Sequence, residues 1–557
     1  MKDSLTGRLS GHPYILIVLS AFVAYLTTGG SLGVMPEIGV FLCLVYGGVF
    51  AGLFTGFTCS KKKTVTAVYS AVFSLLGIAV YFTYQAFGYP ELTFMAGGFV
   101  VILSSALMLK LNGKIGTETI ISLLVMAGFW LRLGRVLTTP LGGVYQHDVQ
   151  YFTNDMKRMA HDTYILWFRD NLLLPDFDIR DFGEFYHPPL HYFLSGMFLR
   201  LNSLLFPALA ENYHCIKILT LTYSSVSSLV LIKILKEMGV KDGPLSVGAM
   251  LAVFFPGFSL IASSVNNDIL SVMLSLLSLY FAVVWYKKPS MKGIIYTGLA
   301  IGLAMMSKLS AGFMAFPVGF LFLLGFIKSK TKKDIFKEFV VFALITFPLG
   351  LWFPLRNYIR WGVPFTFVHE LDKSAKVQSL AEFSTFDRLF TNDPAISVFP
   401  YVILNEKEKD YNIFRVLLKT SLFDERQHLN HSFDLLFGTV ILNLLRILLV
   451  IMLAGMVIAV IRAVKKKDRA AETAFAGIIF TVMLVSFVLF CLRYQVFCSM
   501  NFRYVIPLLV PFIYFISVTY DLAERKKQRI VKGIIVCLTS LFCILSAVFV
   551  MTTWIQR

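Results

Sequence analysis

Long apolar runs recur through this chain and constrain its fold more than any other feature. Hydrophobic residues make up 57% of its 557 positions and its mean hydropathy is +0.72, whereas soluble domains hold roughly 45–50% apolar residues. An apolar run of roughly 18–25 residues can cross a bilayer as a helix. The sequence therefore predicts an all-α polytopic membrane protein with about fifteen transmembrane helices. These spans are predicted at Pro13–Leu32, Ile38–Cys59, Val65–Tyr84, Leu92–Leu109, Thr119–Leu137, Cys215–Leu235, Leu245–Ser264, Asp268–Trp285, Gly293–Met306, Ala311–Ile327, Phe339–Phe353, Phe437–Ile461, Thr473–Leu492, Tyr504–Tyr520 and Val531–Thr552.

The positive charges indicate how these helices are oriented. The formal net charge is +18, but clusters of lysine and arginine occupy loops on one side of the predicted spans and give no indication of a nucleic-acid partner. Because such residues concentrate in cytoplasmic loops, we expect this side and the amino terminus to be cytoplasmic and the carboxyl terminus to lie outside. The clusters are Lys61–Lys63, Lys110 with Lys114, Lys233–Lys241, Lys287–Lys288, Lys328–Lys337, Arg462–Arg469 and Arg525–Lys532.

Two long polar regions, 138–213 and 356–436, lie between spans on the outer side. Within the first, Pro188–Leu205 is apolar enough to be a span, but counting it as one would place every later basic loop outside. We therefore predict a helix that lies in the outer interface. The chain divides accordingly into a four-helix membrane module at 1–112, a core at 113–436 that carries both outer regions, and a second four-helix module at 437–557.

His147-Asp148 stands near the start of the first outer region. Apolar residues follow it at helical spacing from Tyr151 to Tyr164, which is typical of an amphipathic helix. A carboxylate at the head of such a helix can act as a general base on a hydroxyl. An aspartate that caps the helix is an equally good interpretation.

The sequence His187-Pro188-Pro189-Leu190-His191 ends the polar stretch and begins the interfacial helix. Prolines suit a helix start, where backbone amides have no partner. The spacing of His187 and His191 is compatible with a metal site, but no glutamate stands between them. Histidines that contact lipid headgroups are the favoured interpretation.

The next outer turn is very short and contains Asn266-Asn267-Asp268. Asparagine and aspartate are common in turns for purely structural reasons. The functional alternative is a second polar group beneath the first outer region.

Several cations stand on the outer side, against the overall bias. Lys308 follows one span, Arg356 follows another, and Arg503 precedes a third. Ionisable residues at membrane depth are functional candidates, and the arginine fork fits phosphate oxygens. Arg132 and Arg135 share this placement. Convergence of these cations on one anion is one interpretation, and snorkelling toward lipid phosphates is the other.

Taken in order, these motifs resemble those of the membrane-embedded GT-C glycosyltransferases, in particular the family 39 branch of protein O-mannosyltransferases and the lipid A aminoarabinose transferase. The resemblance rests on Asp148, on HPPL followed by HYFLSG, and on NND, SKLSAG, WFPLRNYIRWGVPF and FRYVIPLLVP, from about Thr119 to Pro511. It implies a GT-C-like core at 113–436. It also implies inverting transfer of one monosaccharide from a polyprenyl-phosphate donor to a protein, lipid or glycan hydroxyl, on the outer face of a bacterial cell membrane.

The resemblance also implies roles for single residues. Asp148 resembles the catalytic base, and Arg356 and Lys308 resemble contacts to the donor phosphate, with Arg503 beside them. The family often has two adjacent acids at the first motif, whereas here the neighbour of Asp148 is His147, so the need for a divalent metal ion stays open. The residues expected to support the site are His147, His187, Asn267, Asp268 and Tyr504.

The chemistry of the residues agrees with this interpretation independently. A phosphate leaving group needs charge stabilisation more than protonation, so one carboxylate and a group of cations suffice. A polysaccharide polymerase or ligase would use the same lipid-linked donor but transfer a whole glycan. A transporter or flippase would show internal repeats and ionisable groups near the bilayer midplane. No repeat is evident in the sequence, and its unusual charges lie at one surface.

Overall fold

The computed structural model describes residues 20–26, 37–59, 63–87, 90–139, 141, 161–209, 213–368, 378–391, 393–405, 408–425, 432–466 and 468–552. Within these ranges the chain is helical and forms no extended strand, which confirms the prediction of an all-α membrane protein. The α-helices are α3 (Glu37–Cys59), α4 (Lys63–Phe87), α5 (Pro90–Leu111), α6 (Thr117–Thr138), α7 (His161–Asn171), α8 (Leu190–Leu205), α9 (Lys217–Glu237), α10 (Asp242–Phe254), α11 (Pro256–Leu260), α12 (Asp268–Lys287), α13 (Met291–Ser307), α14 (Ala315–Lys328), α15 (Lys332–Trp361), α16 (Thr385–Phe390), α17 (Pro394–Val398), α18 (Ile413–Phe423), α19 (Ser432–Lys466), α20 (Ala470–Arg493), α21 (Leu509–Arg525) and α22 (Arg529–Thr552). The short 3-10 helices are η1 (Gly183–Tyr186), η2 (Pro207–Leu209), η3 (Tyr213–Ile216), η4 (Ile261–Ser263), η5 (Leu309–Met314), η6 (Phe497–Met500) and η7 (Phe502–Leu508).

Twelve helices in the described ranges are long and apolar enough to cross a membrane, and a bent pair makes a thirteenth candidate span. The twelve coincide with twelve of the predicted spans. The bent pair is α10 with α11 and η4, which turn by 52° at Pro256, where the proline removes a helical hydrogen bond and restricts the residue before it. The 17-residue helix α13 occupies another predicted span, and the predicted span Pro13–Leu32 lies mostly outside the described residues.

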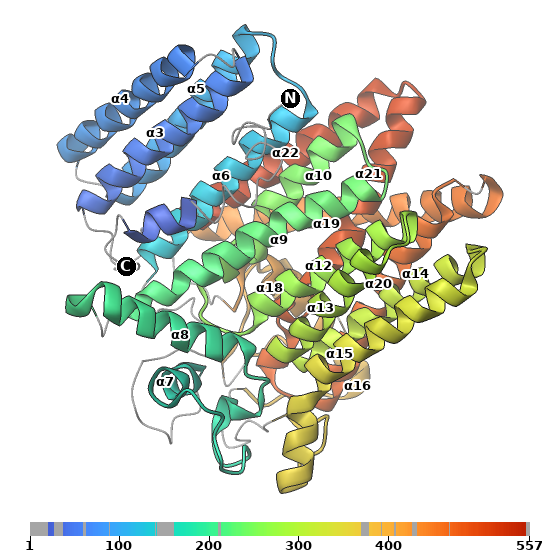
Figure 1. The fold of residues 1–557 in the computed structure, drawn as a ribbon. Coiled ribbons are helices and arrows are strands. Elements are labelled where there is room, and N and C mark those ends of the chain that lie inside the picture. Colours follow the sequence, from blue (N-terminus) through green and yellow to red (C-terminus); the bar gives the residue numbers. More distant parts are fainter. Residues whose placement is uncertain are drawn as a thin grey trace.

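Helices α3, α4 and α5 form a layer at one edge of the bundle, and α6 joins this layer to the rest (Figure 1). Gly52 allows α3 to pack closely on α4, because a Cβ there would lie 2.3 Å from the Cα of Ser70. Trp130 of α6 stacks on Phe94 of α5 with ring centroids 4.3 Å apart. Its Nε1 donates to the Phe94 carbonyl at 3.0 Å, so this contact attaches the layer to α6.

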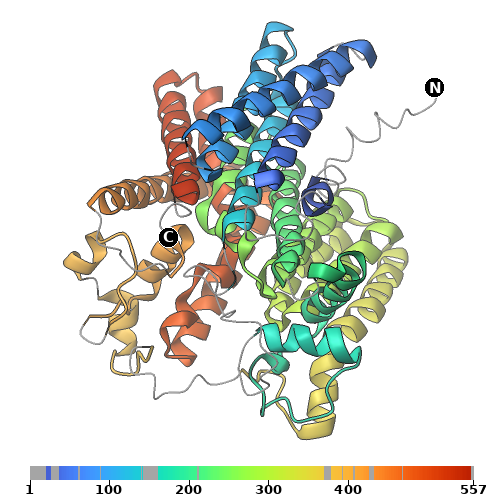
Figure 2. The ribbon, with the colours of Figure 1, turned by 90° about the vertical axis from the view of Figure 1, so that its left-hand side faces the viewer.

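Helices α7 and α8 lie at the same end of the molecule as the last turns of α15 (Figure 2). Gly196 brings α8 against α7, since a Cβ there would lie 2.8 Å from the carbonyl oxygen of Ile165. With 16 residues, α8 is shorter than the candidate spans. This length agrees with the predicted interfacial helix.

The second outer region is held together by a buried ion cluster. Asp410 lies 2.6 Å from Nε of Arg415 and 3.0 Å from Nζ of Lys419. Burial lowers the pKa of Lys419 to about 8, although the Asp410 carboxylate opposes this shift. The region also pairs with the loop after α20, because the Leu380 N–H donates to the Gln495 carbonyl at 2.9 Å.

Candidate active site

The turn before α12 is fixed to the end of α13 by its own side chains. Oδ1 of Asn266 accepts the N–H of Asp268 at 3.1 Å. Nδ2 of Asn267 donates to the Ser307 carbonyl at 3.1 Å, and the Ser307 hydroxyl donates to the Asn267 carbonyl at 3.1 Å. All these side chains are buried. The turn therefore sets the relative positions of Asp268, at the start of α12, and Lys308, directly after α13.

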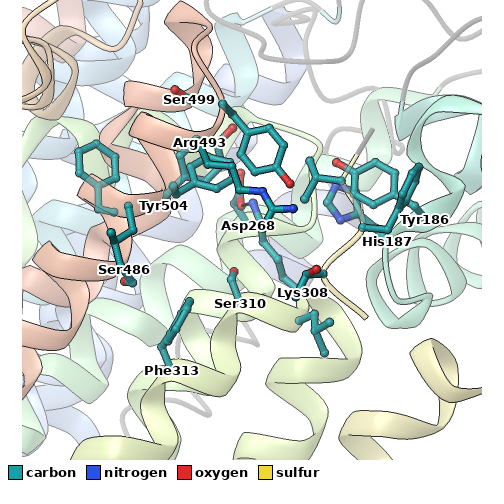
Figure 3. Close-up of a pocket in the computed structure, with 18 of the residues that line it drawn as sticks. Tyr186, His187, Asp268, Lys308, Ser310, Phe313, Ser486, Arg493, Ser499 and Tyr504 are labelled. Carbon is teal, nitrogen blue, oxygen red and sulfur yellow. Dashed lines mark hydrogen bonds and ion pairs between the residues drawn. The ribbon is translucent and has the colours of Figure 1, made fainter. Parts of the chain in front are cut away.

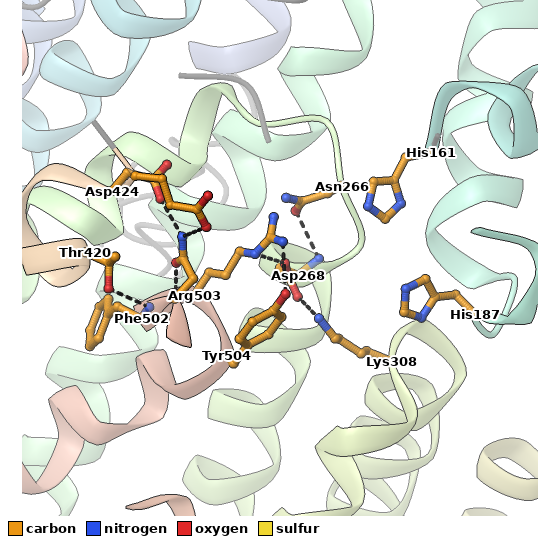
Figure 4. A network of polar contacts seen from close by, with 12 residues as sticks. His161, His187, Asn266, Asp268, Lys308, Thr420, Asp424, Phe502, Arg503 and Tyr504 are labelled. Atoms are coloured by element: carbon orange, nitrogen blue, oxygen red, sulfur yellow. Dashed lines mark hydrogen bonds and ion pairs between the residues drawn. The ribbon is translucent and has the colours of Figure 1, made fainter. Parts of the chain in front are cut away.

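Asp268 lies at the centre of a charged cluster formed with Lys308 and Arg503 (Figure 4). Lys308 pairs with one carboxylate oxygen of Asp268, and Nε of Arg503 lies 3.5 Å from the other. Arg503 also donates to the Tyr504 hydroxyl at 3.0 Å, and Nζ of Lys308 lies 4.5 Å from the centre of the Tyr504 ring. Because one carboxylate meets two cations, this cationic cluster keeps a net positive charge that can attract an anion.

A second polar group faces the cationic cluster. Figure 4 shows His161 and His187 on the side of Lys308. Nε2 of His187 lies 3.1 Å from a carboxylate oxygen of Glu184, and the same oxygen lies 3.9 Å from Nδ1 of His161. Nδ1 of His161 also hydrogen-bonds to the Tyr192 hydroxyl at 2.7 Å. Carboxylate, imidazole and phenol groups thus form a connected chain.

Burial determines the protonation states of His187 and His191. Burial lowers the pKa of His187, although Glu184 partly opposes the shift. Burial also lowers the pKa of His191, to about 3. Both imidazoles are therefore neutral at neutral pH. Burial raises the pKa of Tyr192, so its hydroxyl keeps its proton.

The cationic cluster and the Glu184–His187 pair line one cavity of about 1460 Å³ (Figure 3). The rest of the cavity wall is largely apolar and comes mainly from η5, the start of α14, the end of α15 with the loop after it, and α20. We call this part the apolar slot. The residues that define it here are Phe313, Phe316, Val482, Val485, Leu489 and Phe490.

The chemical character of the cavity changes along its length. In Figure 3, Phe313 and Ser486 lie toward one end, Lys308 and Arg493 lie in the middle, and His187 lies at the other end. The sequence of environments is therefore apolar, then cationic, then carboxylate with imidazole. A ligand that fills this cavity needs the same order of chemical groups.

Most of the predicted site residues that the structure describes meet in this cavity. They come from four separate segments of the chain, which the packing of α8, α12, α13 and α20 with η7 brings together. His147 and Asp148 lie outside the described residues. The predicted residues that line the cavity are His187, Asn267, Asp268, Lys308, Arg503 and Tyr504.

Arg356 does not join them. Helix α15 continues through Pro354 to Trp361, so Arg356 lies within a helix and not at the opening of a loop. Its guanidinium donates to the Pro175 carbonyl at 2.6 Å and lies 4.8 Å from the centre of the Trp361 ring. Arg356 therefore ties the first outer region to α15, and it is not part of the cavity wall.

Arg132 and Arg135 also lie away from the cavity. Both side chains are fully enclosed within the bundle. Arg132 donates to the hydroxyls of Ser224 at 2.9 Å and Ser228 at 2.8 Å, both on α9. Arg132 therefore neither joins the cavity nor snorkels toward lipid phosphates, because these two serines accept hydrogen bonds from its guanidinium inside the protein.

Among the acidic and basic residues that line the cavity, sequence reasoning misses Arg493, Glu184 and His161. Arg493 follows the predicted span Thr473–Leu492 on the outer side, which is the same signal that identifies Lys308. Glu184 stands three residues before His187, a spacing that a tight turn brings into contact. The sequence therefore contains a signal for Arg493 and one for Glu184, whereas His161 meets them only through the packing of α7.

In the described part of the chain, no three His, Cys, Asp or Glu side chains are grouped as metal ligands would be. His187 lines the cavity, whereas the side chain of His191 is completely buried. These two histidines therefore do not form the metal site that their spacing allows.

Residues 186–352 match the family model described as dolichyl-phosphate-mannose-protein mannosyltransferase. This range contains His187, the turn at Asn267 and Asp268, and Lys308. The match confirms the resemblance to the GT-C glycosyltransferases over this part of the chain.

The crystal structure of the oligosaccharyltransferase of Archaeoglobus fulgidus in its apo form aligns with this fold at a TM-score of 0.41 and 11% sequence identity. The alignment covers 77% of this chain and 55% of the archaeal chain, so this chain spans about half the length of that enzyme. A comparison with curated proteins gives no match.

Proposed function

We propose that this protein transfers one monosaccharide from a polyprenyl-phosphate donor to an acceptor hydroxyl on the extracytoplasmic side of a bacterial cell membrane, with inversion at the anomeric carbon. The observation that carries the proposal is the order of environments in the cavity. An apolar slot leads to the cationic cluster of Asp268, Lys308 and Arg503. A polyprenyl phosphate has the same order, with an apolar chain followed by an anion.

The apolar slot suits a membrane lipid. Phe316 and Leu489 line it and expose 61% and 62% of their surfaces, so the slot reaches the outside of the bundle where lipid lies. Along α20 it runs from Thr481 to Phe490, a length of about 14 Å at the helical rise per residue. The head of a lipid chain fits in the slot while the remainder stays in the bilayer.

The chemistry follows from charge. The acceptor oxygen forms a bond to the anomeric carbon while the bond from this carbon to the phosphate oxygen breaks, and the electron pair leaves with the phosphate. The transition state resembles an oxocarbenium ion. Lys308 and Arg503 stabilise the negative charge that develops on the phosphate. A carboxylate takes the proton of the acceptor hydroxyl, and we assign this role to Asp148.

The other predicted residues have supporting roles in this scheme. Asn267 fixes the turn that presents Asp268, and Tyr504 lies against both cations of the cluster. We propose that His147 supports its neighbour Asp148. Arg356 contributes by holding the first outer region on α15.

The first experiment measures release of polyprenyl phosphate by the purified protein from a panel of polyprenyl-phosphate monosaccharides, with membrane extract as the source of acceptors. Asp148→Asn should reduce release roughly 100- to 10,000-fold, the range for loss of a general base. Asp155→Asn, in the same outer region, is the matched control and should retain activity. Release that persists in Asp148→Asn removes Asp148 from the mechanism. A folded wild-type protein that releases nothing from any donor refutes the proposed function and favours a polymerase or a transporter.

A further inference from the structure

Glu184 and His187 line the end of the cavity beyond the cationic cluster. Both belong to one tight turn at η1, where the N–H of His187 donates to the Glu184 carbonyl at 3.1 Å. Their side chains also meet, with 3.1 Å between Nε2 of His187 and the Glu184 carboxylate. The two side chains are 13% and 19% exposed, so each reaches the cavity but is otherwise enclosed.

This pair is unsuited to bind the phosphate. The carboxylate of Glu184 repels an anion, and His187 carries no charge at neutral pH because burial lowers its pKa. The cationic cluster lies between the pair and the apolar slot (Figure 3). A phosphate held by Lys308 and Arg503, with its lipid chain in the slot, therefore directs its remaining substituent toward Glu184 and His187.

The pair offers hydrogen-bond acceptors to that substituent. A neutral His187 that donates through Nε2 to Glu184 keeps an acceptor lone pair on Nδ1. The Glu184 carboxylate has several lone pairs and donates nothing when ionised. Both groups thus complement hydroxyl or ammonium donors, and both are unfavourable for a second carboxylate.

Side chains behind the pair hold it in place. His161 lies 3.9 Å from the Glu184 carboxylate and hydrogen-bonds at 2.7 Å to the buried hydroxyl of Tyr192. The rings of His161 and His187 are stacked with centroids 5.9 Å apart. A polar pair that is fixed in this way can discriminate between hydroxyl arrangements, because a mismatched ligand leaves its polar atoms unpaired.

We infer that Glu184 and His187 form the subsite that recognises the donor sugar, and that this subsite selects a neutral or amino sugar over a uronic acid. The inference rests on the proposed function, because it requires the donor phosphate to lie at the cationic cluster.

The test compares three ligands: polyprenyl phosphate, the same lipid phosphate with a neutral hexose, and the same lipid phosphate with a hexuronic acid. Binding is measured on the full-length protein in nanodiscs for the wild type, for Glu184→Gln and for Asp181→Asn. Asp181 is an exposed acid of the same outer region and does not line the cavity, so it serves as the matched control. If Glu184→Gln does not fold, Glu184→Asp replaces it. This variant keeps the negative charge on a side chain that is one methylene shorter.

We expect Glu184→Gln to weaken binding of the neutral-hexose donor roughly 10- to 100-fold, which corresponds to a lost hydrogen bond to a charged group. Binding of polyprenyl phosphate should not change, and the preference for the neutral hexose over the uronic acid should shrink. Equal losses for the hexose donor and for polyprenyl phosphate, or unchanged binding of all three ligands, would overturn the inference. A wild-type protein that does not bind polyprenyl phosphate at all would instead refute the proposed function.

Discussion

Replacing Lys308 with glutamine tests the cationic cluster most directly. Lys308 and Arg503 both pair with Asp268. In Lys308→Gln the remaining Arg503–Asp268 pair is neutral, so the cluster loses its net positive charge. Asp268→Asn makes the opposite change, because it leaves both cations and removes the carboxylate that competes with a phosphate for them. The two variants should therefore change phosphate binding in opposite directions.

The structure sets the size of the effect. Two unit charges 4 Å apart attract each other by about 4 kcal/mol at an effective dielectric constant of about 20. The side chain of Lys308 is 16% exposed, so solvent screens part of this attraction, and the smaller value of roughly 1.5–3 kcal/mol for a hydrogen bond to a charged group applies. Lys308→Gln should thus weaken polyprenyl phosphate binding roughly 10- to 150-fold. Arg503 remains paired with Asp268, so we expect the variant to fold.

The assay titrates purified protein in nanodiscs with polyprenyl phosphate and counts bound lipid by native mass spectrometry. Lys292→Gln is the matched control, since Lys292 lies in the first turn of α13, at the end opposite Lys308. Unchanged affinity in Lys308→Gln would refute the reasoning, as would weaker binding in Asp268→Asn. Either result would show that the net charge of the cluster does not hold the phosphate.

Three further predictions concern residues outside the cationic cluster. Asp410→Asn should lower the free energy of unfolding by roughly 3–5 kcal/mol, because it leaves two buried cations without their carboxylate; chemical denaturation measures this loss, and an unchanged midpoint contradicts it. The pKa of His191 falls from 6.5 to about 3 on folding, so between these values the unfolded chain binds a proton that the folded protein does not. The free energy of unfolding should therefore decrease as the pH falls through this window, by up to about 1.4 kcal/mol per pH unit, and His191→Phe should flatten a profile of Tm against pH. Arg356→Ala should leave polyprenyl phosphate affinity unchanged but make the loop around Pro175 more sensitive to protease, since it removes the hydrogen bond to that loop; a tenfold loss of affinity would return Arg356 to the phosphate site.

The membrane spans are predictable because apolar length is a local property of the sequence. The residue at which a span ends is harder to predict. Because proline usually disrupts a helix interior, Pro354 favours a helix that ends at Phe353. In the structure α15 continues through Pro354, which places Arg356 on a helix face toward the first outer region. The position of Arg356 outside the cavity wall therefore follows from the longer course of α15.

The site residues are only partly predictable for a different reason. Lys308 and Arg503 stand out because cations on the outer side oppose the general charge bias. Their convergence on Asp268 depends on how α12, α13 and η7 pack, and spacing along the chain carries no information about this. Arg132 stands out by the same signal, yet serines on α9 bind it inside the bundle. The charge pattern thus identifies unusual residues, and only the packing separates site residues from structural ones.

The proposed reaction explains why a carboxylate, that of Asp268, would lie beside the donor phosphate. In the proposed reaction the donor is a phosphodiester with one negative charge. The released polyprenyl phosphate would be a monoester whose second pKa is about 6, so it would carry nearly two. Two cations with one carboxylate complement the single charge of the donor and accommodate the extra charge of the product less well. Asp268 therefore favours product release, a step that limits many enzymes. Asp268→Asn should then lower kcat at saturating donor while it strengthens inhibition by added polyprenyl phosphate. A fall in kcat with weaker product inhibition would mean that Asp268 acts on the chemical step instead.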